Sequence, residues 1–134
     1  MQGHSLTPNA IQLLQRRYLR KDTKGRVVET PDGMFRRVAR HVAKADLSYR
    51  PPDSFAQTVR GFYRMMYRLE FLPNSPTLMN AGRERGQLAA CFVLPVGDSL
   101  KSIFEAVKYS ALIHQSGGGT GFSFSRLRPK NDRV

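Results

Sequence analysis

The chain has 134 residues and a formal net charge of +12, with 40% apolar residues, 24% charged residues and a single cysteine. This composition is globular, and it excludes disordered, fibrous, disulfide-linked and membrane-spanning classes, since no apolar run reaches the roughly 18 residues of a transmembrane helix. Because the N-terminus lacks a secretory pattern, we expect a cytoplasmic protein, and its positive charge favours polyanionic partners such as nucleotides or nucleic acid.

Three amphipathic helices are predicted in the first 70 residues. Thr7 and Thr30 each precede a proline, which is the pattern of a helix N-cap followed by proline in the first turn. The first helix is expected to extend to about Leu19. A third helix follows a double proline, with Asp53 or Ser54 as its cap. The second helix carries an apolar stripe with helical spacing, formed by Phe35, Val38, Ala39 and Val42.

A strand–helix–strand unit is predicted in the second half of the chain. Residues 88–96 are uncharged with an apolar centre, which predicts a buried strand. Asp98 and Ser99 then form the start of a helix, which the glycines at 117–119 end before a second strand at 121–125. This order predicts a parallel pair with a right-handed crossover. The apolar face of the helix is predicted to consist of Leu100, Ile103, Phe104, Val107 and Ala111.

Residue chemistry alone leaves each candidate site open between a structural and a functional role. Cys91 in an apolar strand is most often a small buried hydrophobe, and a redox role would need a partner thiol. The glycines at 117–119 allow backbone N–H groups to approach an anion, but they also end a helix. Asp98 has a structural explanation as a helix cap, and Arg128 has one as a solvated surface cation. No histidine has a companion at metal-ligand spacing, so no metal site is expected.

The segments NSPTLMNAG, CFVLPV and SGGGTGFSFSRLRP together resemble the first part of the catalytic domain of ribonucleotide reductase large subunits. These motifs are most similar to those of the adenosylcobalamin-dependent (class II) branch. The resemblance implies a mixed α/β fold with an N-terminal helical subdomain at 1–72. At 73–134 it implies the first strand–helix–strand unit of a ten-stranded α/β barrel. The barrel is expected to be truncated in this chain, because the radical cysteine and the second redox cysteine of such enzymes lie beyond Val134.

The resemblance also implies an activity, a cofactor and partners. The activity is that of a ribonucleoside-diphosphate reductase, which converts ribonucleotides to 2′-deoxyribonucleotides for DNA synthesis by thiyl-radical chemistry. Adenosylcobalamin would be the cofactor, with a dithiol reductant, a deoxynucleotide effector and a possible homodimer in the full-length enzyme. By this resemblance Cys91 is a redox-active thiol. Substrate contacts are implied for Ser75, Ala90, Cys91 and Gly119, and effector contacts for Asp98 and Arg128.

Two alternatives remain open at this point. A small basic helical module could bind nucleic acid, and its binding would then weaken steeply with salt concentration. A short accessory protein could instead pair with a separately encoded catalytic remainder. On the leading interpretation the 134 residues alone would not reduce nucleotides, because the radical and the partner thiol would be missing.

Overall fold

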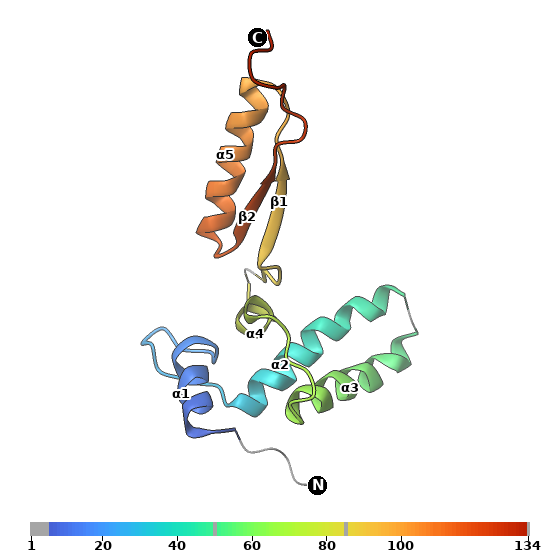
Figure 1. Ribbon diagram of the computed structural model, residues 1–134. Helices are drawn as coiled ribbons and strands as arrows, with labels where there is room; N and C mark the ends of the chain where they lie inside the picture. The colour runs from blue at the N-terminus through green and yellow to red at the C-terminus, as the bar shows by residue number, and fades with distance from the viewer. Residues whose placement is uncertain (1–5, 50, 85, 134) are drawn as a thin grey trace. The chain divides into compact units, whose positions relative to one another are not determined.

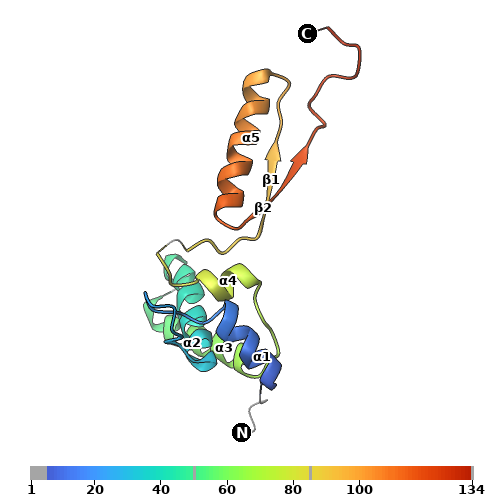
Figure 2. The same ribbon diagram turned by 90° about the vertical axis from the view of Figure 1, so that its left-hand side faces the viewer.

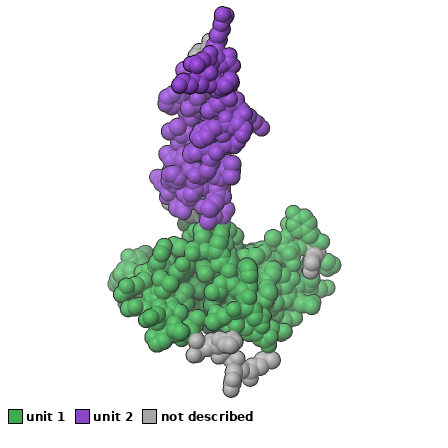
Figure 3. Space-filling model, viewed as in Figure 1, with its two compact units in different colours: residues 1–88 green, residues 89–134 purple. Residues whose placement is uncertain are grey.

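The computed structural model describes residues 6–49, 51–84 and 86–133, which form two compact units. Unit 1 comprises residues 1–88 and unit 2 comprises residues 89–134, as coloured in Figure 3. The sequence placed the boundary after residue 72, whereas the compact units divide after residue 88. The difference arises because the helix that follows residue 72 packs against a helix of the N-terminal half.

Helices build most of unit 1 (Figure 1). Both predicted threonine caps are confirmed: Thr7 Oγ1 accepts the Ala10 N–H at 3.2 Å, and Thr30 Oγ1 accepts the Gly33 N–H at 3.1 Å. The first helix ends before the predicted Leu19. The α-helices are α1 (Pro8–Arg17), α2 (Pro31–Ala43), α3 (Phe55–Tyr67) and α4 (Ser75–Asn80), with 3-10 turns η1 (Lys44–Ser48) and η2 (Pro52–Ser54).

The predicted cap of the third helix is wrong. Ser54 is the residue before α3, but its hydroxyl donates to the Pro51 carbonyl at 2.8 Å and does not accept from the helix. The 3-10 turn η2 leads directly into α3, and the Ser54 N–H bonds to the Pro51 carbonyl at 3.0 Å. Backbone carbonyls of the turn therefore satisfy N–H groups that a side-chain cap would otherwise serve.

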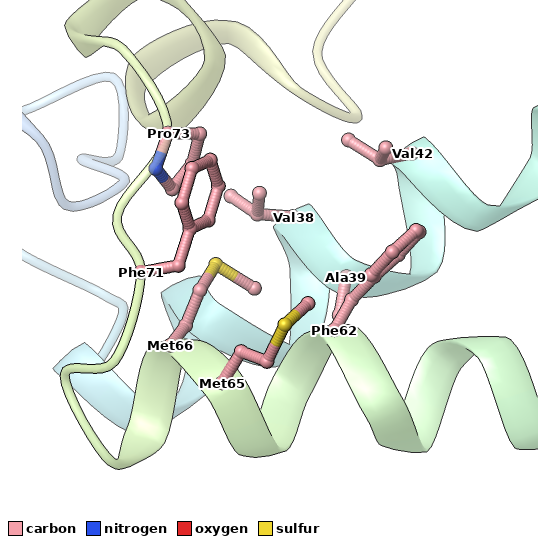
Figure 4. Close-up of a pocket in the computed structure, with 8 residues that line it drawn as sticks. All are labelled: Val38, Ala39, Val42, Phe62, Met65, Met66, Phe71 and Pro73. Atoms are coloured by element: carbon pink, nitrogen blue, oxygen red, sulfur yellow. The ribbon is translucent and has the colours of Figure 1, made fainter.

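The core of unit 1 forms where α2 packs against α3 and α4. The predicted stripe on α2 is confirmed except at Val42, whose side chain is 36% exposed. Val42 lies at the rim of an apolar cavity of about 110 Å³, where side chains of α2 and α3 face Phe71 and Pro73 (Figure 4). The buried core residues are Leu19, Met34, Phe35, Val38, Ala39, Met66, Leu78 and Ala81.

Unit 2 confirms the predicted strand–helix–strand order. β1 (Cys91–Pro95) and β2 (Gly119–Ser123) pair in parallel, and α5 (Leu100–Gln115) connects them along one face of the pair (Figures 1 and 2). The prediction that the first strand is buried is wrong, because Val93 is 76% exposed. Within residues 86–133 α5 covers one side of the two strands, and the Val93 side of β1 is open.

The predicted apolar face of α5 is also wrong. Leu100, Phe104 and Val107 are 74%, 67% and 58% exposed, and Ala111 is exposed as well. The helix instead packs through Ala106, which is 6% exposed. Apolar residues lie on more than one face of this helix, so its sequence permits two stripes, and the small Ala106 side chain allows a close approach to the strands. None of the helices in the described part of the chain is long and apolar enough to span a membrane.

Candidate functional site

The start of the parallel strand pair brings together three of the residues singled out in the sequence. Cys91 and Gly119 are register partners, and the Gly119 N–H donates to the Ala90 carbonyl at 2.7 Å. Cys91 is a free, exposed cysteine, so its sulfur is accessible to a reactant. The structure therefore contradicts the interpretation of Cys91 as a buried hydrophobe in this chain.

The three glycines at 117–119 differ in what the fold requires of them. Gly117 has a φ of +88°, which side chains rarely adopt, and its N–H bonds to the His114 carbonyl at 3.0 Å to close α5. A Cβ on Gly118 would lie 2.8 Å from Ile113 Cγ2 and 3.0 Å from Phe92 Cε2. A Cβ on Gly119 would meet only the Ala90 carbonyl, at an ordinary 3.7 Å. The backbone conformation therefore favours glycine at 117 and the packing requires it at 118, whereas neither requires it at 119.

Gly118→Ala is expected to destabilise unit 2 by about 1–3 kcal/mol, because the added methyl group overpacks the contact between α5 and β1. Faster amide hydrogen exchange in β1 and β2 would report this loss. Gly121→Ala is the matched control, since a Cβ there meets nothing within 4 Å. Equal exchange rates in the two variants would contradict the packing argument.

A polar cluster fastens the beginning of β2 to α5. The Thr120 hydroxyl lies 2.9 Å from the Ser110 hydroxyl and 2.9 Å from His114 Nε2. The ring of His114, in the last turn of α5, thus bonds to a residue of β2. This contact depends on the crossover that places β2 beside α5, and no local pattern reveals it. The cluster holds the residue that directly follows Gly119.

Asp98 and Arg128, the two predicted effector residues, form an ion pair. Arg128 Nε donates to Asp98 Oδ2 at 2.7 Å, and both side chains are about one-third exposed. The structural role predicted for Asp98 is wrong, because Ser99 caps α5 by accepting the Ser102 N–H at 3.2 Å. The carboxylate of Asp98 is therefore free of the helix terminus and aligned with a guanidinium 30 residues away in the sequence.

Ser75, the remaining predicted site residue, belongs to unit 1, whereas Ala90, Cys91 and Gly119 belong to unit 2. Ser75 is exposed and is the first residue of α4, a short helix that the sequence analysis does not predict. Asn74 caps this helix by accepting the Thr77 N–H at 3.1 Å. The Ser75 hydroxyl lies 3.0 Å from the hydroxyl of Tyr18.

A buried ion pair holds the other end of α4 and was not predicted. Arg37 donates to both carboxylate oxygens of Glu29, at 2.7 and 2.9 Å, and both side chains are 9% exposed. Arg37 also donates to the carbonyls of Ala81 at 2.6 Å and Leu78 at 3.2 Å, at the C-terminal end of α4. Burial alone would raise the pKa of Glu29, but hydrogen bonds from Arg37 and from the Arg20 N–H lower it below its usual value.

The described residues contain no group of three or more His, Cys, Asp or Glu side chains that could hold a metal ion. The candidate residues offer a thiol, hydroxyl groups, backbone amides, a carboxylate and a guanidinium. Thiol chemistry requires an accessible sulfur, and Cys91 meets that requirement.

Two family models match almost the whole chain. The model for the ribonucleotide reductase all-alpha domain matches residues 4–86, and the model for the ribonucleotide reductase barrel domain matches residues 89–134. These two matches meet where the compact units divide.

Curated proteins and a solved structure show the same similarity. The vitamin B12-dependent ribonucleoside-diphosphate reductase of Thermoplasma acidophilum is 43% identical, over 96% of this chain and 24% of that protein. The protein of the same name from Mycobacterium tuberculosis is 49% identical, over 93% of this chain and 18% of that protein. The structure of the Actinobacillus ureae class Id ribonucleotide reductase alpha subunit matches with a TM-score of 0.74 and 28% identity, over 95% of this chain and 22% of that one.

The chain spans about a quarter or less of the length of these relatives. The similarities confirm the family resemblance drawn from the sequence and the mixed fold of helices followed by a parallel strand pair. They lend no support to a nucleic-acid-binding module or to a separate accessory protein.

Proposed function

The chain belongs to the ribonucleotide reductase large-subunit family, and from this membership we propose that it supplies the all-α domain and the opening barrel unit of an adenosylcobalamin-dependent ribonucleoside-diphosphate reductase. The observation that carries the proposal is the exposed Cys91 thiol beside Gly119 at the start of the parallel pair. Curated relatives named as vitamin B12-dependent support the branch.

In the proposed reaction Cys91 acts as an electron donor to the ribose. Cys91 and a second thiol from outside the described residues lose two electrons and two protons and form a disulfide. The ribose 2′ hydroxyl leaves as water, and a hydrogen takes its place on C2′. An external dithiol then reduces the disulfide for the next turnover. The cytoplasm suits this role, because its reducing conditions keep such a thiol reduced.

One substrate contact is proposed at Gly119 and the backbone of Ala90 in unit 2, and another at Ser75 in unit 1. Gly119 supports this proposal, because an alanine Cβ at this position would not clash with any atom of the described residues. The missing side chain at this position allows a ligand to approach the backbone closely. The Ser75 hydroxyl is exposed and can donate to an oxygen of the nucleotide.

The described residues do not form a site for the corrin cofactor. The apolar cavity between α2 and α3 is lined by apolar side chains, which give the polar periphery of a corrin no hydrogen-bond partner. No cluster of metal-ligating side chains occurs in the described part of the chain. We therefore assign the cofactor to residues other than these, and the proposed contacts of this chain are with nucleotides, a dithiol and a second subunit.

The proposal is tested in a full-length reductase that carries these 134 residues, for example one in which they replace the matching segment of the Mycobacterium tuberculosis relative. With adenosylcobalamin and a dithiol, this reductase is expected to form deoxynucleotides from ribonucleoside diphosphates. A folded protein that binds nucleotide but forms no deoxynucleotide would contradict the proposal.

Arg128→Ala in this reductase is expected to weaken binding of the deoxynucleotide effector by about 1–3 kcal/mol, the scale of a hydrogen bond to a charged group. Asp98→Asn should also blunt the effector-driven choice of base, and the helix cap is not involved because Ser99 provides it. Titration of effector while reduction of all four nucleotides is followed measures both effects. Arg126→Ala, an exposed neighbouring arginine, is the control. An equal loss of effector affinity in Arg126→Ala and Arg128→Ala would show that Arg128 acts only through the overall positive charge of the chain.

A further inference from the structure

A tyrosine hydroxyl is in contact with the proposed substrate-binding serine. Tyr18 and Ser75 are 57 residues apart in the sequence, and their hydroxyl oxygens are 3.0 Å apart. Ser75 is exposed and Tyr18 is half-buried, so the serine is the more accessible of the two residues to a ligand. Neither the family models nor the names of the relatives assign a role to Tyr18.

The acidity of the two groups decides which hydroxyl donates. A phenol O–H is a stronger hydrogen-bond donor than the O–H of an aliphatic alcohol. Tyr18 is therefore expected to donate to Ser75 Oγ, which leaves the Ser75 proton free to point toward a ligand. A hydroxyl that accepts one hydrogen bond becomes a better donor in the next, so this arrangement strengthens a bond from Ser75 to a nucleotide oxygen.

Tyr18 is held in place by its backbone and its ring. It is the C-cap residue of α1, and its N–H donates to the Leu14 carbonyl at 2.9 Å. Its own carbonyl accepts from Arg83 Nη2 at 3.3 Å. The side chain packs against the core cluster of unit 1. The phenol is thus fixed before any ligand arrives.

The helix that carries Ser75 is held at both ends. Asn74 caps its start and also donates from Nδ2 to the Leu88 carbonyl at 3.1 Å. Arg37 binds the Leu78 and Ala81 carbonyls at its other end. With α4 and Tyr18 both fixed, the distance between the two hydroxyls is set by the fold of unit 1.

We propose that Tyr18 is a positioning residue for the nucleotide substrate and that it acts by orienting the Ser75 hydroxyl as a donor. The inference rests on the proposed function, in which Ser75 contacts the ribonucleotide. Tyr18 itself does not touch the substrate in this arrangement. Its effect on the substrate therefore passes entirely through Ser75.

Tyr18→Phe removes the hydroxyl and keeps the ring. In the full-length reductase this variant is expected to weaken ribonucleotide binding about three- to tenfold, as for the loss of one hydrogen bond. The change should appear in the KM more than in kcat, and in the Kd from equilibrium dialysis. Ser75→Ala should weaken binding by at least as much. The double variant should bind no more weakly than Ser75→Ala alone, because the tyrosine acts through the serine.

Tyr49→Phe is the control, since this tyrosine is 88% exposed and belongs to the same unit. If Ser75→Ala weakens binding and Tyr18→Phe does not, the role of Tyr18 is overturned and the substrate contact of Ser75 stands. If Ser75→Ala has no effect, the proposed contact itself fails, and the inference fails with it. Additive effects in the double variant would also overturn the inference.

A second variant changes the donor strength of the Tyr18 hydroxyl without removing it. Replacement of Tyr18 by 3-fluorotyrosine keeps the hydroxyl and makes the phenol a stronger acid. At a pH where the phenol stays protonated, substrate binding is expected to tighten, because the donor to Ser75 is stronger. This gain should disappear in the Ser75→Ala background. Weaker binding by the fluorinated protein, or a gain that persists without the serine, would overturn the proposal.

Discussion

Cys91→Ser in a full-length reductase that carries these residues is expected to abolish multiple turnover. A serine hydroxyl cannot form a disulfide with the second thiol, so the two electrons that replace the ribose 2′ hydroxyl are not delivered. Abstraction of the ribose 3′ hydrogen should remain possible, because Cys91 is proposed to donate electrons and not to hold the radical. Deoxynucleotide formed per enzyme, in the presence of excess dithiol, measures the loss.

The matched control for this prediction is Val93→Ser. Val93 lies two residues along β1, on the same face as Cys91, and its side chain is 76% exposed. A serine there tests whether a hydroxyl on this face of the strand disturbs the enzyme for other reasons. An unchanged steady-state rate in Cys91→Ser would show that Cys91 has only a structural role.

Glu29→Gln is expected to lower the free energy of unfolding of unit 1 by about 3 kcal/mol. The substitution leaves the Arg37 guanidinium buried without its carboxylate, and breaking one side of a buried pair has a cost of this size. The amide also presents N–H groups to a side chain that has only donors. Urea unfolding of the 134-residue chain, followed by circular dichroism in the helical signal, measures the change.

The effect of Glu29→Gln should depend on pH. The pKa of Glu29 is lower in the folded chain than its usual value of 4.5, so the unfolded chain binds more protons in acid. The stability from this carboxylate is therefore present above pH 4.5 and is lost as the pH falls through the folded pKa. The difference between the original chain and Glu29→Gln should shrink over that acidic range.

The control is Glu70→Gln, because Glu70 pairs with Arg68 at 3.6 Å with both side chains about half exposed. Exposed pairs contribute little to stability, so this variant should unfold almost as the original chain does. A similar loss of unfolding free energy in both variants would show that burial does not increase the contribution of the Arg37–Glu29 pair to stability. A difference at position 29 that stays constant down to the lowest pH would contradict the lowered pKa.

Local patterns predicted the elements of this chain well. The caps at Thr7 and Thr30 involve residues three apart, so a short stretch of sequence contains both partners of each bond. The order of β1, α5 and β2 likewise predicted a parallel pair, because a crossover helix between two strands permits that arrangement. The order of residues 71–134 also carried the family resemblance, and with it the candidate residues.

Long-range packing decided what local patterns left open. The face of α5 that meets the strands is set by the fit of Ala106, and the hydrophobic pattern of this helix pointed to another face. The partner of Asp98 is Arg128, 30 residues away, and not the helix terminus next to it.

The sequence by itself determined α1, α2, α3, α5 and the order of the two strands, because the bonds and patterns that specify them lie within a few residues, and the family resemblance of its motifs supplied the candidate residues. Only the tertiary structure decided that Cys91 is exposed, that Tyr18 meets Ser75 and that Arg37 joins Glu29 to the end of α4. The physical reason is that such contacts join residues 8 to 57 positions apart. The packing of the elements determines which residues become partners, and no periodic pattern in the sequence predicts it.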